Sequence, residues 1–421
     1  MKAMVPAAEA EAKILALATP LDGPQAMEQV SLGAATGRIL AQPVTGGLDM
    51  PHWDNSAMDG YAVRHQDVAQ ASADQPVTLT LTETIPAGKP PTQPVAPGQA
   101  ARILTGSMMP EGSDTVVMQE VTQRRDDRVL ILEAPPPGQF VRHRGSFYQA
   151  GQPLMAAGTA LGGPELAVLA AAQCVQVPVF RRLRVAILST GDELVNPETP
   201  LEPGKIVDSN QYALAALVQA AGAEPVRMGL VPDQPDALAA AIQSALAQAD
   251  VILSSGGVSV GDFDYVDRIL ADLGATLHIR SVAVRPGKPL TVATVPRGGD
   301  PSASALYFGL PGNPVSALVS FWRFVEPALR KMSGLKEGWP PQFVEAVTQH
   351  PLKGGGPREI YLWGRLSPKA ETPSQYTFAL AGGSHSSGNL VNLAGANALA
   401  VIPVGTERLP EGAIVQVMVV R

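Results

Sequence analysis

The sequence predicts an α/β multidomain protein whose central part is a three-layer α/β domain with a mostly parallel sheet. Strand-like apolar runs alternate with helical patterns between residues 181 and 333. Short runs rich in Val, Ile and Thr, separated by Pro and Gly, fill residues 51–147 and return after residue 334. The composition, with 45% hydrophobic and 16% charged residues, suits a chain that buries cores and excludes a disordered one.

The 421 residues are expected to divide into four parts. Two segments with helical spacing of Ala, Leu and Val flank a β-rich insert, and they could pack together as one discontinuous domain. Within the first of them, we expect helices at 6–19 and 24–41, with Asp22 beginning the second. The parts are a helical and β N-terminal linker region (1–50 with 148–180), the β-rich insert (51–147), the α/β domain (181–333) and a C-terminal β-domain (334–421).

Apolar runs and capping residues place the elements of the central domain. Asp233 is expected to cap one helix, and Asn313 with Pro314 is expected to begin another. The predicted strands are 183–188, 225–231, 251–253, 277–284 and 305–310, and the predicted helices are 211–221, 234–249, 265–273 and 314–332.

Composition excludes several classes of protein. The net charge of −7 argues against a nucleic-acid partner. A single cysteine, Cys174, excludes an intrachain disulfide and a cysteine metal cluster. No run of roughly 18 apolar residues exists, and Glu9 and Glu11 interrupt the first apolar stretch, so neither a membrane span nor a signal peptide is expected. The sequence predicts a cytoplasmic enzyme.

Four loops follow predicted strands and are rich in Gly, Pro and polar residues. Because ligands bind beyond the carboxyl ends of the strands in an open parallel sheet, we expect the four loops to meet at one site. They read STGDEL (189–194), SSGGVSVGDFD (254–264), RPGKP (285–289) and GLPGNPVSA (309–317).

The residue types in these loops suit phosphate and a divalent cation. The three glycines of 254–264 allow backbone N–H groups to approach a phosphate, and Asp262 and Asp264 could hold Mg²⁺. Arg285 and Lys288 are presented by a loop that two prolines stiffen, which suits an oxyanion. Ser316 lies at an expected helix N-terminus, which is also an anion site. Taken singly, each loop has a plainer interpretation as a helix cap, a surface loop or a solvated basic turn.

Other segments also carry polar side chains, though less specifically. Residues 54–64 (DNSAMDGYAVR) begin the insert, and RILTG (102–106) places a hydroxyl and a glycine at the end of a strand. Ser384 and Ser386 lie in a serine-rich segment that could bind an anion without charge, and Arg358 follows three glycines. A surface turn and solvated loops are the alternatives.

Together these strings resemble the MoeA/gephyrin E-domain family. The resemblance extends from about residue 8 to 418 in the order of the family. Its most specific pieces are DNSAMDGYA and GLPGNPVSA, and the others are RILTG, STGDEL, DSNQ (208–211), SSGGVSVGDFDYV, RPGKPL and the serine-rich segment.

The resemblance implies a molybdopterin molybdenumtransferase. That activity inserts molybdate into adenylylated molybdopterin, releases AMP and requires Mg²⁺. A homodimer with its active site between subunits is implied, as are contacts with the molybdopterin adenylyltransferase and with molybdoenzyme acceptors. Neither nucleic acid nor a membrane is implied as a partner.

The resemblance also implies catalytic and binding roles for the residues at matching motif positions. Asp59, Thr105, Glu193 and Asp264 are implied as catalytic, with Glu193 and Asp264 around the metal. Further acidic candidates are Asp208, Asp233 and Asp262. The substrate and molybdate pocket is implied to contain Arg285, Lys288, Pro311, Pro314, Ser316, Arg358, Ser384 and Ser386.

The chain departs from the family at two positions. Phe147 stands where the family usually has an acid, and Arg285 stands where a lysine is common. Alternatives to the molybdate enzyme are a paralogue that prefers tungstate, a gephyrin-like binding or scaffold protein, and a pyrophosphatase of other nucleotides. The insert motif at 54–64 argues against the pyrophosphatase.

Overall fold

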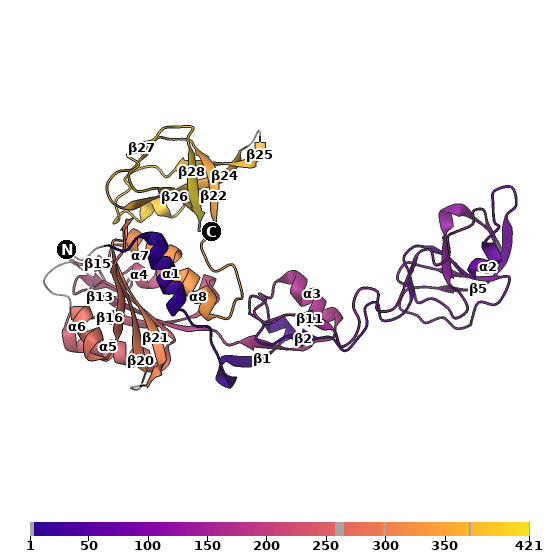
Figure 1. Ribbon diagram of the computed structural model, residues 1–421, viewed down its shortest axis with the longest axis horizontal. Helices are drawn as coiled ribbons and strands as arrows, with labels where there is room; N and C mark the ends of the chain where they lie inside the picture. Colours follow the sequence, from indigo (N-terminus) through magenta and orange to yellow (C-terminus); the bar gives the residue numbers. More distant parts are fainter. Residues whose placement is uncertain (1–3, 257–264, 298–299, 370–371, 421) are drawn as a thin grey trace.

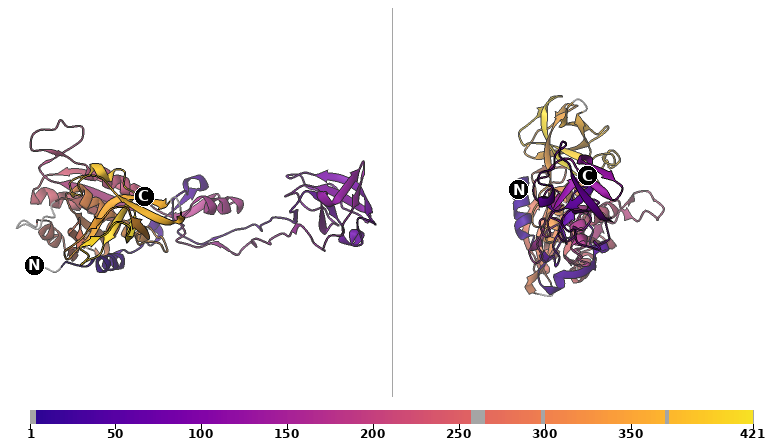
Figure 2. Two further views of the ribbon diagram at one scale, coloured as in Figure 1. Left: turned by 90° about the horizontal axis from the view of Figure 1, so that it is seen from above. Right: turned by 90° about the vertical axis from the view of Figure 1, so that its right-hand side faces the viewer.

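The structure, a computed structural model, describes residues 4–256, 265–297, 300–369 and 372–420. Figure 1 shows an elongated molecule with the α/β domain and the C-terminal β-domain at one end, the β-rich insert at the other, and a narrow middle part between them. The left view of Figure 2 shows the same separation. The predicted α/β multidomain class is confirmed.

A six-stranded sheet forms the middle layer of the α/β domain, in the order β16-β13-β17-β21-β20-β18. The first four strands are parallel, β20 is antiparallel to β21, and β18 is antiparallel to β20. Strand β20 was not predicted, because it pairs directly with the next strand and no helix separates them. The bounds are β13 (Arg184–Thr190), β16 (Glu224–Val231), β17 (Val251–Ser255), β18 (Thr276–Ser281), β20 (Pro289–Arg297) and β21 (Asp300–Leu310).

Helices cover both faces of this sheet. Val185 and Ile187 of β13 face one cluster, and the intervening Ala186 and Leu188 face the other, as the alternation of side chains along a strand requires. The first cluster contains α4 and the helical segment after β21, and the second contains α5 and α6. The helices are α4 (Asn210–Ala220), α5 (Pro235–Gln248), α6 (Tyr265–Asp272), α7 (Pro314–Ser320), the π-helical turn η4 (Phe321–Val325) and α8 (Glu326–Met332).

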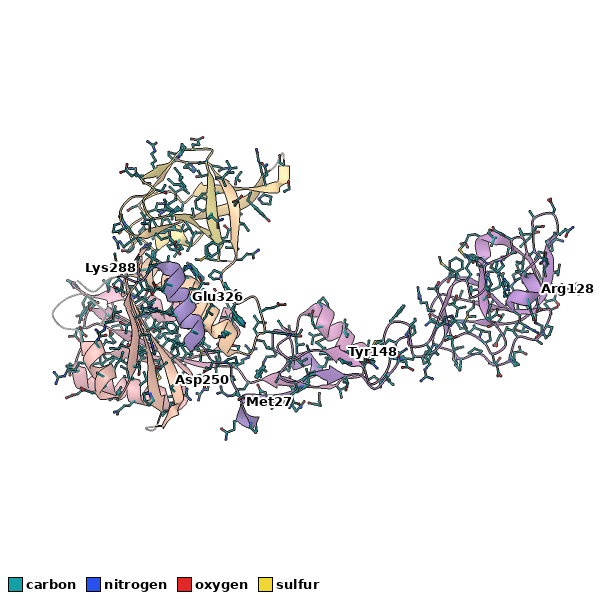
Figure 3. All side chains as sticks on the ribbon, in the orientation of Figure 1. Met27, Arg128, Tyr148, Asp250, Lys288 and Glu326 are labelled. Carbon is teal, nitrogen blue, oxygen red and sulfur yellow. The ribbon has the colours of Figure 1, made fainter. Side chains whose placement is uncertain are left out.

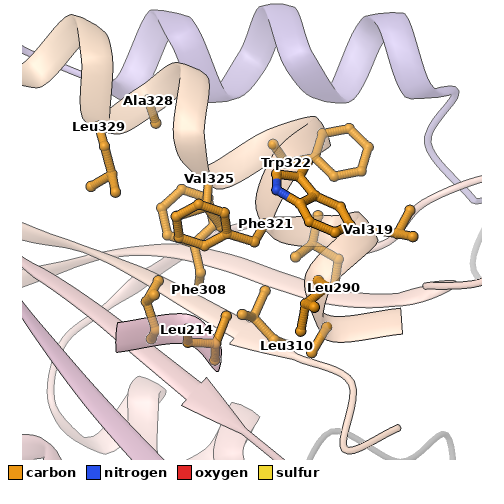
Figure 4. Packing of buried hydrophobic residues seen from close by; sticks show 14 of the residues in the cluster. Leu214, Leu290, Phe308, Leu310, Val319, Phe321, Trp322, Val325, Ala328 and Leu329 are labelled. Atoms are coloured by element: carbon orange, nitrogen blue, oxygen red, sulfur yellow. The ribbon is translucent and has the colours of Figure 1, made fainter. Parts of the chain in front are cut away.

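The first helix, α1 (Ala7–Leu17), packs against α8 and η4. Ala10 and Ile14 are buried in the same cluster as Phe321 and Phe308, and Figure 4 shows the helix lying over these rings. Although the sequence groups residues 1–50 with the linker region, these contacts lead us to propose that α1 belongs with the α/β domain.

The middle part is built from two segments far apart in the chain. Strand β1 pairs with β12 and β2 pairs with β11, both antiparallel. The predicted helix over 24–41 is wrong: pairing with β12 imposes a strand there, and Asp22 accepts a hydrogen bond from the N–H of Gly23 in a turn. The elements are η1 (Pro24–Ala26), β1 (Met27–Ser31), η2 (Leu32–Ala34), β2 (Val44–Thr45), β11 (Pro153–Met155), α3 (Gly163–Ala171) and β12 (Gln176–Phe180).

The insert contains its own six-stranded sheet, in the order β7-β4-β6-β5-β9-β8, and its own buried clusters. The insert is therefore rich in β-strands, as the sequence predicts. Its elements are β3 (Asn55–Ser56), β4 (Gly60–Val63), α2 (His65–Val68), β5 (Val77–Ile85), β6 (Gln99–Ile103), β7 (Thr115–Met118), η3 (Gln119–Val121), β8 (Thr122–Arg125), β9 (Arg128–Ile131) and β10 (Val141–Arg142).

The C-terminal domain is a small closed barrel, because β24 pairs with both β25 and β26 at the two ends of the order β24-β25-β22-β28-β26. Strand β19 (Val284–Arg285) of the α/β domain adds to it beside β24. The strands are β22 (Phe343–Thr348), β23 (Leu352–Lys353), β24 (Glu359–Lys369), β25 (Thr372–Leu380), β26 (Ala398–Ile402), β27 (Arg408–Leu409) and β28 (Ile414–Val419), with η5 at Val391–Leu393.

Candidate active site

Two cavities adjoin at the carboxyl edge of the central sheet. The first has a volume of about 690 Å³ and the second about 610 Å³. Pro289 and Ser316 line both, so the cavities share a wall. Their sizes fall in the range of small-molecule sites.

Acidic side chains and short loops line the first cavity. Glu193, Asp208 and Asp233 contribute carboxylates, and none of its described lining residues is Lys or Arg. The flap formed by β14 (Leu194–Val195) and β15 (Ile206–Val207) adds an apolar wall. The lining residues are Thr190, Gly191, Glu193, Leu194, Ile206, Val207, Asp208, Ser209, Asn210, Asp233, Ser255, Gly256, Pro289, Pro311, Gly312, Asn313, Pro314, Ser316, Gly388 and Leu390.

One glycine explains how close two of these loops lie. Gly256 has a φ of +92°, and a Cβ there would approach the carbonyl oxygen of Thr190 to 2.3 Å. Such an approach is impossible for any residue with a side chain. The position therefore requires glycine for the end of β17 to approach the end of β13 so closely.

Asn210 joins two loops of the first cavity, and the sequence prediction did not include it. Its Nδ2 donates to Ser255 Oγ at 2.6 Å and to the carbonyl oxygen of Gly312 at 2.8 Å. Asp208 is buried, and its Oδ1 accepts from the backbone N–H groups of Asn210 and Gln211 at the start of α4. Asp208 is thus a helix cap as well as a lining residue, and DSNQ in the resemblance was the available signal.

Basic side chains line the second cavity. Arg285, Lys288, Lys353 and Arg358 contribute cations, and none of its described lining residues is Asp or Glu. The cavity spans the joint between the α/β domain and the barrel, where Figure 3 shows Lys288. Its other lining residues are Pro286, Gly287, Pro289, Ser316, Gly354, Ile360, Tyr361, Leu362, His385, Ser386 and Ser387. Sequence reasoning missed Lys353, His385 and Tyr361, because no strand-end motif marks them.

The loop that carries Arg285 and Lys288 is packed tightly on helix α7. Gly287 has a φ of +107°, and a Cβ there would lie 2.8 Å from Ser320 Oγ. Arg285 also belongs to β19, which pairs with Glu359 and Ile360 of β24. The loop is therefore held by strand pairing at Arg285 and by close packing against α7 at Gly287.

Of the two predicted helix starts, the one at Asn313 is confirmed and the one at Asp233 is not. Asn313 and Pro314 begin α7 as expected, although the side chain of Asn313 makes no capping hydrogen bond. The predicted cap at Asp233 is wrong, because Gln234 precedes α5 and Pro235 begins it. Asp233 instead donates its backbone N–H to Asp192 Oδ1, which leaves its carboxylate lining the first cavity.

Asp59 and Thr105 form a separate pair on the insert. The backbone N–H and the Oγ1 of Thr105 both donate to Asp59 Oδ1 at 2.8 Å, and these two bonds hold the pKa of Asp59 below its ordinary value. The insert lies at the far end of the molecule (Figure 1), so one chain does not bring this pair to either cavity.

The remaining predicted residues divide into three groups. Asp262 and Asp264 lie outside the described residues, and no group of acids, His or Cys within the described ranges forms a metal cluster. Ser384 lines neither cavity, and its carbonyl oxygen accepts hydrogen bonds from Asn389 and Asn392. Phe147 is 72% exposed in the segment that returns from the insert.

Family models match almost the whole chain. Residues 5–172 match the MoeA N-terminal region (domain I and II), residues 186–331 match a probable molybdopterin binding domain, and residues 345–420 match the MoeA C-terminal region (domain IV). The chain belongs to the MoeA family. The family resemblance predicted from the sequence is thereby confirmed.

Relatives of this MoeA chain agree with the family models. A molybdopterin molybdenumtransferase of Nostoc sp. is 57% identical over 405 residues, covering 96% of this chain and 91% of the relative. One from Bacillus subtilis is 36% identical, covering 94% and 90%. A solved molybdopterin biosynthesis MoeA protein from Pyrococcus horikoshii has a TM-score of 0.82 at 28% identity, covering 99% and 100%. Among the described helices, none is long and apolar enough to cross a membrane.

Proposed function

We propose that this MoeA chain is a molybdenumtransferase that inserts molybdate into adenylylated molybdopterin with release of AMP. The observation that carries the proposal is the pair of adjoining cavities with opposite charge, which share Ser316 and Pro289. A reaction that joins a tetrahedral dianion to a nucleotide-bearing substrate needs two such neighbouring sites. The names of the relatives support the same activity and give no support to a scaffold role.

In this proposal the second cavity holds molybdate. Arg285, Lys288 and Arg358 supply fixed cations, and Ser316 and Ser386 supply neutral donors. Charge-assisted hydrogen bonds to an oxyanion are about twice as strong as neutral ones, so a small dianion gains most from such a set. Ser316 lies at the shared wall, where its hydroxyl could orient the anion toward the other substrate.

The first cavity would hold the adenylylated end of the substrate. Its apolar flap, with Leu194, Ile206 and Val207, offers a surface for a flat ring. The carboxylates of Glu193 and Asp233 are hard oxygen donors that fit Mg²⁺, with Asp264 as a further expected ligand. When bound, Mg²⁺ would neutralise charge on the phosphoanhydride as AMP leaves. Without a cation, these acids would repel the phosphates.

We propose further that the enzyme is a homodimer and that a partner subunit brings Asp59 and Thr105 to the cavities. The separation of the insert from the α/β domain within one chain supports this arrangement. A symmetric dimer could place each insert over the other subunit's cavities. A cytoplasmic location, and contacts with the molybdopterin adenylyltransferase and molybdoenzyme acceptors, belong to the same proposal.

The direct test is an assay of AMP release. Purified protein is mixed with adenylylated molybdopterin, molybdate and Mg²⁺, and AMP is measured by chromatography. The proposal expects release that requires both molybdate and Mg²⁺, together with molybdenum bound to the pterin product. Tungstate in place of molybdate tests the choice of anion. No release with all components present would overturn the proposal.

A further inference from the structure

One wall of the second cavity comes from the barrel. Tyr361, Ile360 and Leu362 of β24 line it, and Arg358 precedes the strand. The opposite wall, with Lys288 and Ser316, belongs to the α/β domain. The spacing of the cations around an anion therefore depends on how β24 is held against that domain.

A buried arginine joins the two walls. Arg323 of η4 is 5% exposed, and its Nε donates to the hydroxyl of Tyr361 at 2.9 Å. Its Nη1 donates to the carboxylate of Glu11 on α1, and the Tyr361 hydroxyl donates to the carboxylate of Glu359. The chain of bonds thus runs from α1 through the α/β domain to the strand that lines the cavity.

The backbone at Arg323 is unusual. Residues 321–325 form a π-helical turn between α7 and α8, and such turns are frequent at functional sites. The guanidinium also lies over the rings of Phe324 and Phe343, at 5.4 and 5.7 Å from their centroids. Phe343 belongs to β22 of the barrel, so Arg323 contacts two barrel strands.

Stability alone does not account for this arginine. Burying an ion pair has a desolvation cost that often exceeds the Coulombic gain, and apolar residues of similar volume serve a core as well. A planar guanidinium, however, fixes the direction of its hydrogen bonds, so it can orient the Tyr361 hydroxyl.

Strand β24 is also held beside the cavity by its pairing with β19, in which Glu359 lies opposite Val284 and Ile360 opposite Arg285.

We propose that Arg323, acting through the Tyr361 hydroxyl, is a positioning residue. It sets the distance, across the second cavity, between Arg358 and the wall that contains Lys288 and Ser316. The inference rests on the proposed function, since the probe is molybdate. Arg323 does not line either cavity, and it acts only by holding the strand that does.

Two variants test the inference. Arg323→Lys keeps the charge but loses the planar fork, and Tyr361→Phe keeps the ring and the Arg323–Glu11 pair but loses the shared hydroxyl. Arg181→Lys is the matched control, because Arg181 makes a two-bond ion pair with Asp250 at the opposite edge of the sheet. Figure 3 shows Asp250 far from Lys288.

Titration calorimetry of the full chain measures the dissociation constants of molybdate and, with Mg²⁺ present, of AMP. We expect molybdate to bind about ten-fold more weakly to both variants, by analogy with residues that orient metal ligands. AMP binding should change less than about two-fold, and Arg181→Lys should match the wild type for both ligands. A general loss of structure would weaken both ligands together.

The outcomes separate this inference from the proposed function. Wild-type molybdate affinity in Tyr361→Phe would overturn the inference, and that variant decides the matter even if Arg323→Lys does not fold. Equal weakening of AMP and molybdate would also overturn it, since the effect would then be structural. Absence of molybdate binding to the wild type would overturn the proposed function, and the inference with it.

Discussion

The two cavities lie at the same sheet edge and share a wall, yet their charges are opposite. The first is lined by Glu193, Asp208 and Asp233, and the second by four cations. The difference has a structural origin. The first cavity uses loops of the α/β domain and one segment near residue 388, whereas the second borrows Lys353 and Arg358 from the barrel.

Loops at one edge of a sheet therefore need not form one uniform site. In the proposed function the basic cavity binds molybdate directly, the acidic cavity binds the phosphates through Mg²⁺, and the shared Ser316 lies where the two substrates would meet. Substitutions in the first cavity should therefore affect Mg²⁺ and AMP, and substitutions in the second should affect molybdate. In the proposed dimer, the insert with Asp59 would add a third surface, contributed by the partner subunit.

The largest expected effect follows from removing the carboxylate charge on the insert. Asp59→Asn should lower turnover by about 10³-fold, the scale seen when one preorganised catalytic group is lost. Molybdate and AMP affinities should stay near those of the wild type, as should the melting temperature. The exposed Asp74→Asn is a control in the same domain. Wild-type turnover in Asp59→Asn would contradict the role of the insert.

A mixing experiment sharpens this prediction. At a molybdate concentration near the wild-type dissociation constant, the Asp59→Asn and Lys288→Ala chains should each have little activity alone, but a mixed dimer contains one intact site if each site uses two subunits. Random exchange should then restore about a quarter of the wild-type activity. If the mixture stays inactive while the dimers exchange, the insert does not act on the other subunit.

The next largest effect is on molybdate binding in the second cavity. Lys288→Ala should weaken molybdate about 10²-fold, because a hydrogen bond to a charged group contributes roughly 1.5–3 kcal/mol. AMP binding in the presence of Mg²⁺ should be unchanged, and calorimetry measures both. Lys89→Ala, an exposed lysine on the insert, is the control. Equal loss of both ligands would break the distinction between the cavities.

A smaller effect is expected on the acidic side. Glu193→Gln should raise the Mg²⁺ concentration needed for half-maximal turnover about ten-fold, because a neutral amide is a weaker ligand for a hard cation. Molybdate affinity should not change. Glu198→Gln, exposed in the loop between β14 and β15, serves as the comparison. An unchanged Mg²⁺ requirement would remove Glu193 from the proposed metal site.

The smallest effect is a shift in pKa. Because the N–H and hydroxyl of Thr105 lower the pKa of Asp59, Thr105→Val should raise that pKa toward the ordinary value of 3.8. Activity that needs ionised Asp59 is present above its pKa and is lost as pH falls through it, so in Thr105→Val the loss begins at a higher pH. Carboxyl NMR titration measures the shift, with Thr105→Ser expected to behave as the wild type.

Much of the site could be predicted because it depends on local sequence. The loops after β13, β17 and β21, and the loop between β19 and β20, occur where polar and Gly-rich strings follow apolar runs. Strand β18 runs parallel to β21, since both are antiparallel to β20, so its following loop reaches the same edge. The described residues of these loops therefore lie at a shared edge, as predicted, although β20 was missed.

The remainder depends on long-range pairing that local patterns do not encode. Residues 27–31 became a strand because β12, about 150 residues later, pairs with them. Tyr361 lines the second cavity because its strand, β24, pairs with β19 of the α/β domain. Neither partner can be identified from hydrophobic spacing alone, and the resemblance to a family supplied roles but not these contacts.

The most direct test of the central claim is a crystal structure with molybdate, AMP and Mg²⁺, in which anomalous scattering locates molybdenum. We predict the molybdenum peak in the cavity lined by Lys288 and Arg358, with the AMP phosphate in the neighbouring cavity beside Glu193 and Ser316 between them. A molybdenum peak among the acids of the first cavity, or both ligands in one cavity, would contradict the account.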